Sequence, residues 1–152
     1  MKPNTGADAP PLPVPIGDGV DLCRELAGFQ DPHCYICEAE LLPPYEMDHF
    51  PIPKCCGGAH TMRVCRACHD LKDRAAWITV ATTLVDGIRE ISFYKEDSRN
   101  LNFLLHGELS AVARWVHDCW SDFGRAGRIF AARLLRVRYM REHKKAQPER
   151  EG

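Results

Sequence analysis

The sequence contains no long hydrophobic run, and this absence limits where the protein can reside. No stretch of the 152 residues approaches the roughly 18 to 20 consecutive apolar residues that a membrane-spanning helix needs. The opening segment, MKPNTGADAPPLPVPIGDG, also lacks the apolar core and the cleavage pattern of a secretory signal peptide. We therefore expect no membrane residence and a location in the cytoplasm.

The chain also has little net charge and no internal repeat. Its formal net charge is −1 at pH 7, which taken alone does not favour a polyanionic partner. Its length is that of one ordinary domain. Residues 1–18 hold five of the eleven prolines and little that could be buried, so we expect them to form a disordered leader.

Cysteine, in contrast, is abundant, and its spacing indicates a metal site. Four of the eight cysteines form two CxxC pairs, CYIC and CRAC. Without a secretion signal, a disulfide framework is disfavoured. Two CxxC pairs supply four thiolates, which is a ligand set that suits tetrahedral zinc. We predict a structural zinc site that contributes about 10 kcal/mol or more to folding. Its ligands are Cys34, Cys37, Cys65 and Cys68.

The other cysteines fit this site less well. Cys55 and Cys56 could replace one assigned ligand, but adjacent cysteines chelate a single tetrahedral ion poorly, and the two glycines that follow them indicate a turn. We assign both as free thiols. Cys23 and Cys119 lie in apolar helical patterns, which favours small buried side chains.

A second group of possible ligands accompanies the cysteines. Asp48, His49 and His69 offer carboxylate and imidazole groups that a four-sulfur site does not need. His69 could also bind zinc, but four thiolates already satisfy a tetrahedral ion. An isolated Asp-His pair could simply cap a turn before Pro51. Within this cysteine frame, however, the pair indicates a second metal site.

The segment from Cys34 to Asp73 resembles a known family. It contains CxxC, a DH pair with a proline two residues later, GG, and CxxCH followed by a lysine, in that order. This combination resembles the HNH endonucleases, over about a quarter of the chain. The resemblance implies two short strands and a helix around one divalent cation, the ββα-metal fold. It also implies that His49 is the general base, that Asp48 and His69 hold the cation, and that the protein acts in a bacterial or phage-infected cell.

One position departs from the family pattern. His60 stands where HNH endonucleases usually have an asparagine, whose amide braces the hairpin and the general base. A neutral imidazole tautomer does not donate and accept hydrogen bonds in the way that an amide does. His60 is therefore either a catalytic brace or an ordinary surface histidine, and a weakened or inactive enzyme is a further alternative.

The chemistry of phosphodiester hydrolysis calls for these residue types. His49, with an ordinary pKa of about 6.5, is substantially neutral near pH 7 and can accept a proton from the attacking water. Such catalysis typically contributes about 10² to 10⁴ in rate. A Mg²⁺ or Mn²⁺ ion held by Asp48 and His69 would neutralise the charge that develops on phosphate.

Positive charge gathers at the C-terminal end. Residues 123–152 hold nine arginines and lysines against three glutamates, a distribution typical of contact with a polyanion. A solvated helix face explains an isolated charge run equally well. Together with the nuclease motif, the run favours DNA as partner. The predicted nucleic-acid-binding residues are Lys72, Arg125, Arg128 and Arg136.

Hydrophobic periodicity predicts the secondary structure. We expect a helix over 20–28, strands over 46–50 and 61–64, and one helix from Arg66 to about Val85 that stops near Gly87. Residues 88–100 are ambiguous. Apolar residues at steps of three and four predict a helix over 109–123 and, after a break at Gly124 and Gly127, another over 130–140.

The sequence thus predicts an α+β protein with a zinc-stapled ββα-metal core over 19–87 and a basic helical extension over 88–152. The expected function is metal-dependent hydrolysis of DNA. The alternatives are a non-catalytic zinc module that binds nucleic acid or a protein partner, and a hydrolase that acts on RNA. The sequence does not indicate an oligomeric state.

Overall fold

The computed structural model describes residues 32–146. Within this range the chain forms one two-stranded sheet and a set of helices, so the predicted α+β class is confirmed. The predicted leader, the predicted helix over 20–28 and Cys23 lie outside the described residues. No helix in the described part of the chain is both long and apolar enough to cross a membrane.

The two strands form an antiparallel hairpin. Strand β1 (Glu46–His49) pairs with β2 (Thr61–Val64), with Glu46 opposite Val64 and His49 opposite Thr61. Along β2, Met62 and Val64 are buried and their neighbours are more exposed, which is the two-residue period of a strand with one face on a core. Both predicted strands are confirmed to within one residue.

The helix that follows the hairpin is shorter than predicted. Helix α3 (Arg66–His69) continues as a π-helical turn, η3 (Asp70–Arg74), and the backbone becomes extended at Ala75. Arg133 donates hydrogen bonds to the carbonyls of Leu71 and Ala75. Because these carbonyls at the helix end need partners, a side chain from a distant helix helps the chain to turn there. The prediction of one helix over 66–85 is therefore wrong.

A second helix, α4 (Ala81–Phe93), begins six residues after Ala75 and passes through Gly87 without interruption. A Cβ atom at Gly87 would fall 2.6 Å from the Cβ of Phe130 and closer still to the carbonyl oxygen of Ala126. Gly87 therefore permits a close approach of two helices instead of ending one. The predicted boundary between core and extension, at residue 87, falls inside α4.

The remaining elements are helical. They are η2 (Lys54–Cys56), which lies between the two strands, η4 (Tyr94–Glu96), α5 (Asn100–His106), α6 (Leu109–Cys119), η5 (Trp120–Asp122) and α7 (Arg125–Lys145). The two predicted C-terminal helices are confirmed, although Gly127 lies inside the first turn of α7 and not in a break. The Glu90 carboxylate of α4 accepts hydrogen bonds from the backbone N–H groups of Gly124 and Gly127, which satisfies the exposed donors at the start of α7.

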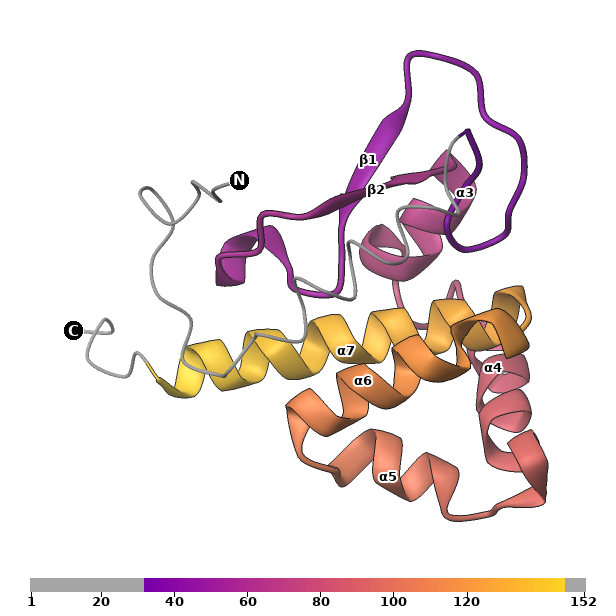
Figure 1. Ribbon diagram of the computed structural model, residues 1–152, viewed down its shortest axis with the longest axis vertical. Helices are drawn as coiled ribbons and strands as arrows, with labels where there is room; N and C mark the ends of the chain where they lie inside the picture. Colours follow the sequence, from indigo (N-terminus) through magenta and orange to yellow (C-terminus); the bar gives the residue numbers. More distant parts are fainter. Residues whose placement is uncertain (1–31, 147–152) are drawn as a thin grey trace.

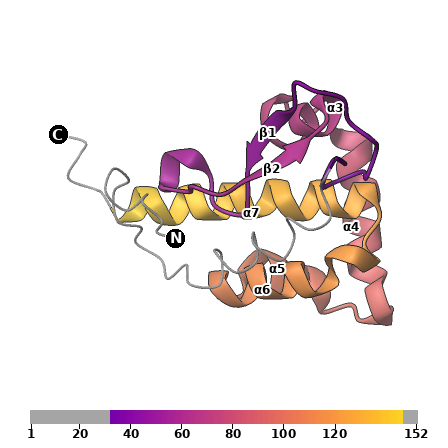
Figure 2. The ribbon, with the colours of Figure 1, turned by 45° about the horizontal axis from the view of Figure 1, so that its top comes forward.

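Helix α7 is the central element. The hairpin and α3 lie on one side of it and α5 and α6 on the other, while α4 crosses near its N-terminal end (Figure 1). Figure 2 shows the same order from a second direction. A helix that is covered on two sides has a buried surface wider than one stripe.

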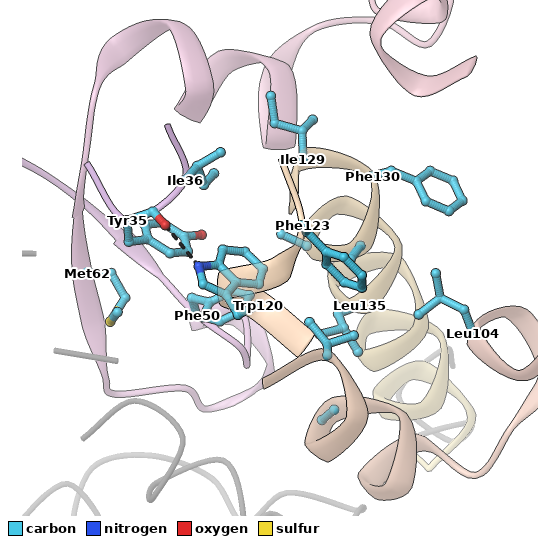
Figure 3. Close-up of a cluster of buried hydrophobic side chains, with 14 of the residues drawn as sticks. Tyr35, Ile36, Phe50, Met62, Leu104, Trp120, Phe123, Ile129, Phe130 and Leu135 are labelled. Atoms are coloured by element: carbon cyan, nitrogen blue, oxygen red, sulfur yellow. Dashed lines mark hydrogen bonds between the residues drawn. The ribbon is translucent and has the colours of Figure 1, made fainter. Parts of the chain in front are cut away.

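Aromatic packing joins the hairpin region to the helices. Figure 3 shows the rings of Tyr35, Phe50 and Trp120 together, with centroids 5.0 to 5.7 Å apart. The indole N–H of Trp120 donates to the backbone carbonyl of Tyr35 over 3.0 Å. Trp120, from the apolar pattern predicted over residues 109–123, thus serves packing, and one hydrophobic core runs through both regions.

Candidate metal centre

The four predicted zinc ligands meet in space. The sulfur atoms of Cys34, Cys37, Cys65 and Cys68 all lie within 4.8 Å of one another. Backbone N–H groups of Ile36 and Cys68 point at the sulfurs of Cys34 and Cys65, each at 3.4 Å. Such N–H contacts favour the charged thiolate. Four converging sulfurs could hold a metal ion such as zinc, whose preferred ligand set they match.

The sulfur cluster has strongly perturbed acidity. A hydrogen bond with Cys68 is the main cause that lowers the pKa of Cys34 to about 4, and the same hydrogen bond raises the pKa of Cys68. Arg125 donates from Nε to the Cys68 sulfur over 3.3 Å. This guanidinium, which we predicted to contact nucleic acid, therefore lies against the sulfur cluster and offsets its negative charge.

A second cluster lies beside the first and is built from harder ligands. It consists of Asp48 on β1, His69 at the end of α3, and Asp73 in η3, with one ligand atom of each within 4.8 Å of the others. His69 Nε2 lies 3.4 Å from Asp48 Oδ1 and 3.4 Å from Asp73 Oδ2. This geometry could hold a divalent cation.

Sequence reasoning did not identify Asp73. The available signal was its position four residues after His69 on a predicted helix, which places the two side chains on one face. The family pattern directed attention to Asp48 and His69 alone.

Glu46 orients the imidazole of this cluster. Its Oε2 atom lies 2.6 Å from His69 Nδ1, so Nδ1–H donates to the carboxylate and Nε2 is directed at the two aspartates. An acidic partner on the far nitrogen is the usual way in which proteins orient a metal-binding histidine. The hydrogen bond with Asp48 is the main cause that raises the pKa of His69, and the hydrogen bond with Glu46 raises it further. A cation must therefore compete with a proton for Nε2.

Asp48 remains ionised although it is buried. Burial on its own would raise the pKa of this carboxyl, but the hydrogen bond with His69 and the nearby Lys72 ammonium outweigh burial and lower it. The cluster therefore presents a charged carboxylate at neutral pH, as a hard cation requires.

His49 lies in a cleft that opens onto this cluster. The cleft has a volume of about 520 Å³ and is lined by Met47, Asp48, His49, Pro53, Lys54, Cys55, His69, Asp73 and Arg136. Burial is the main cause that lowers the pKa of His49. Its imidazole is therefore neutral near pH 7 and able to accept a proton.

The residues predicted to bind nucleic acid lie in different surroundings. Lys72 is 2% exposed, and its ammonium lies 2.6 Å from Asp73 Oδ1 and 3.3 Å from Asp48 Oδ2. Arg128 is 6% exposed and donates to the carbonyls of Trp120 and Ile36. These placements do not support phosphate contacts for Lys72 and Arg128. Arg136 does reach the cleft.

His60 contributes to the hairpin through its backbone. Its carbonyl accepts a hydrogen bond from Phe50 N–H over 3.3 Å, immediately beyond the pair that His49 forms with Thr61. The residue is not among those that line the cleft. The structure therefore shows that the His60 backbone supports the hairpin, and the bracing role of its imidazole stays a prediction.

The remaining described cysteines stay outside the sulfur cluster. Cys55, Cys56 and Cys119 form no disulfide among the described residues, and Cys119 is buried, as predicted. Burial is the main cause that raises the pKa of Cys56 to about 12, whereas Cys55 is exposed in the cleft.

Comparison with protein-family models, curated proteins and solved structures found no match for this chain.

Proposed function

We propose that this protein is a metal-dependent endonuclease of the HNH type that hydrolyses phosphodiester bonds in DNA. The observation that supports this proposal is the arrangement of Asp48, His69 and Asp73 around one point that opens onto the cleft holding His49. The adjacent sulfur cluster would hold a structural zinc ion. One ion would thus stabilise the fold and a different ion would serve the reaction.

The donor atoms of the second cluster fit a hard divalent cation. Two carboxylates and one imidazole suit Mg²⁺ or Mn²⁺, and three protein ligands leave positions for water and phosphate in an octahedral shell. The bound cation would neutralise charge on the phosphoryl and leaving oxygens.

His49 is the proposed general base. It takes a proton from a water molecule, whose oxygen forms a new bond to phosphorus as the bond from phosphorus to the 3′ oxygen breaks. The leaving oxygen gains a proton from solvent. His49 suits this role because its imidazole is neutral at pH 7 and because it lies in the same cleft as the three ligands.

Two cationic side chains in the cleft are suited to hold the phosphate. Lys54 comes from the turn between the strands and Arg136 from α7, and both line the cleft. Arg136 Nε lies 3.3 Å from Asp73 Oδ1, next to the place proposed for the cation. A guanidinium there can pair with two phosphate oxygens at once.

A plasmid-nicking assay tests the proposal. We expect the zinc-loaded protein to nick plasmid DNA in Mg²⁺ or Mn²⁺ and to stop when a chelator removes these ions. His49→Ala is expected to slow nicking by about 10² to 10⁴ while it remains folded. The matched control is His106→Ala, which removes an exposed histidine of α5 and should cut like the wild type.

DNA binding without cleavage in both metals would overturn the proposal and favour a non-catalytic zinc module. Cleavage of RNA but not of DNA would retain the chemistry and change the substrate. Nicking at the wild-type rate in His49→Ala would show that His49 is not the general base.

A further inference from the structure

The two oxygen atoms of each aspartate in the cluster have different neighbours. Asp48 Oδ1 faces His69 Nε2 at 3.4 Å, whereas Asp48 Oδ2 accepts a hydrogen bond from the Tyr35 hydroxyl over 2.6 Å and lies 3.3 Å from the Lys72 ammonium. Asp73 repeats this division. Its Oδ2 faces His69 Nε2 at 3.4 Å, and its Oδ1 lies 2.6 Å from Lys72. The second oxygen of each carboxylate is thus engaged by Tyr35 or Lys72, and Arg136 Nε also lies 3.3 Å from Asp73 Oδ1.

The groups that hold these outer oxygens are themselves held by the fold. Tyr35 is buried, with its ring packed on Phe50 and Trp120 and its backbone carbonyl bonded to the Trp120 indole (Figure 3). From this buried position its hydroxyl donates to Asp48. The Lys72 side chain is buried against the two carboxylates. Because both side chains are buried, neither donor can readily replace its aspartate partner with a water molecule.

We propose that Tyr35 and Lys72 are positioning residues that restrict Asp48 and Asp73 to one metal-facing oxygen each, and that they thereby make the site prefer Mg²⁺ or Mn²⁺ to Ca²⁺. Ca²⁺ takes six to eight oxygen ligands and accepts carboxylates through both oxygens, whereas Mg²⁺ requires a small octahedral shell and retains several waters. Two carboxylates that each offer one oxygen, together with one imidazole, match the small octahedral shell of Mg²⁺. This inference rests on the function proposed for the same site.

The charge of Lys72 acts separately from this geometry. An ammonium beside two carboxylates lowers the negative charge of the site, which weakens the binding of every divalent cation in the same direction. Selectivity between cations must then come from how many carboxylate oxygens each ion can reach. The ratio of two affinities therefore reports positioning, whereas either affinity alone does not.

Calorimetric titration of the zinc-loaded full chain with Mn²⁺ and with Ca²⁺ tests the inference. We expect the wild type to bind Mn²⁺ more tightly than Ca²⁺. In Tyr35→Phe the Mn²⁺ affinity should fall about tenfold, as is common when an outer hydrogen bond to a ligand is lost, while Ca²⁺ binding stays or tightens. The preference for Mn²⁺ should therefore fall by about tenfold or more.

The matched control is Tyr94→Phe. It likewise removes a tyrosine hydroxyl that donates to an aspartate, Asp122, over 2.9 Å, but in the helical region away from the cleft. It should leave both affinities unchanged. Lys72→Met supplies a second variant, in which both ions should bind more tightly and Ca²⁺ should gain more.

Two results would overturn the inference. One is an unchanged Mn²⁺ to Ca²⁺ ratio in Tyr35→Phe and Lys72→Met when both variants retain zinc and the wild-type melting temperature. The other is an equal loss of both ions in Tyr35→Phe, which would show a merely structural role. A wild type that binds neither ion and does not cut DNA would instead contradict the proposed function, so the two failures are distinguishable.

Discussion

Single side chains of α7 that look alike in the sequence have different tasks in the structure. Arg128 is buried, donates to two backbone carbonyls at 2.8 Å each, and pairs with Glu38. It thereby ties the first CxxC turn to the helices. Arg136, two turns later, is half-buried at the cleft. The same residue type therefore contributes to stability at one position and is available to a ligand at the other.

This difference predicts opposite outcomes for two substitutions. Arg128→Met should lower the free energy of unfolding by about 3 kcal/mol, because buried carbonyls lose their partner. Arg136→Ala should change stability by no more than about 0.5 kcal/mol. Urea unfolding of both variants measures this contrast, and equal stability of the two would contradict it.

DNA binding should show the reverse order. In a His49→Ala background, which keeps the DNA intact, Arg136→Ala should weaken binding and reduce the slope of log affinity against log salt by about 1. Fluorescence anisotropy at several salt concentrations would measure the slope. An unchanged slope would show that Arg136 does not contact a DNA phosphate.

Among the secondary-structure elements, α4 and α7 approach each other closely at Gly87. Gly87→Ala should improve the intrinsic helix propensity of α4 by about 1 kcal/mol. Its new Cβ atom, however, would meet Ala126 and Phe130 at less than normal contact distance, and overpacking of this kind costs about 1 to 3 kcal/mol. We expect the collision to dominate and the melting temperature to fall.

Asp86→Ala provides the control for this prediction. Asp86 is the neighbouring, exposed residue of the same helix, so its replacement should change stability by no more than about 0.5 kcal/mol. Equal stability of Gly87→Ala and Asp86→Ala would contradict the close approach of α4 and α7 at Gly87.

The two CxxC segments connect the sulfur cluster to the second site. Tyr35 lies inside the first segment and bonds to Asp48, while His69 directly follows the second. The sulfur cluster therefore helps to place two proposed ligands of the cation. It places Asp48 through Tyr35 and His69 through the neighbouring Cys68. This arrangement explains how a short hairpin with four-residue strands can hold several charged groups in defined positions.

For the molecule as a whole, the two clusters should respond differently to the loss of one ligand. Cys37→Ser should lose zinc and unfold, since a structural zinc contributes about 10 kcal/mol or more and total stability is typically about 5 to 15 kcal/mol. His69→Ala should retain zinc and lose cleavage. Zinc analysis with circular dichroism measures both outcomes.

Cys55→Ser is the matched control, because it removes a thiol outside the sulfur cluster and should retain zinc. Equal loss of zinc from Cys37→Ser and His69→Ala would show that the ligands of the two sites have been assigned incorrectly.

Local patterns in the amino-acid sequence were sufficient to predict the strands, the grouping of the four cysteines and the apolar face of α6. These features depend on neighbours within a few residues, through the periodicity of side chains and through ligand spacing. Local patterns were not sufficient at Gly87 or at the end of α3. There the outcome depends on Phe130, Ala126 and Arg133, which come from the distant helix α7.

The sequence alone thus established which chemical groups the protein carries and roughly where its short elements begin. The packing of α7 against the hairpin and α4 established which charges are buried, which oxygens of Asp48 and Asp73 face His69, and why Asp73 belongs to the cluster. The physical reason is that burial and hydrogen-bond partners are long-range properties. Two arginines or two aspartates of this chain differ in burial and in partners because the fold brings different residues to them.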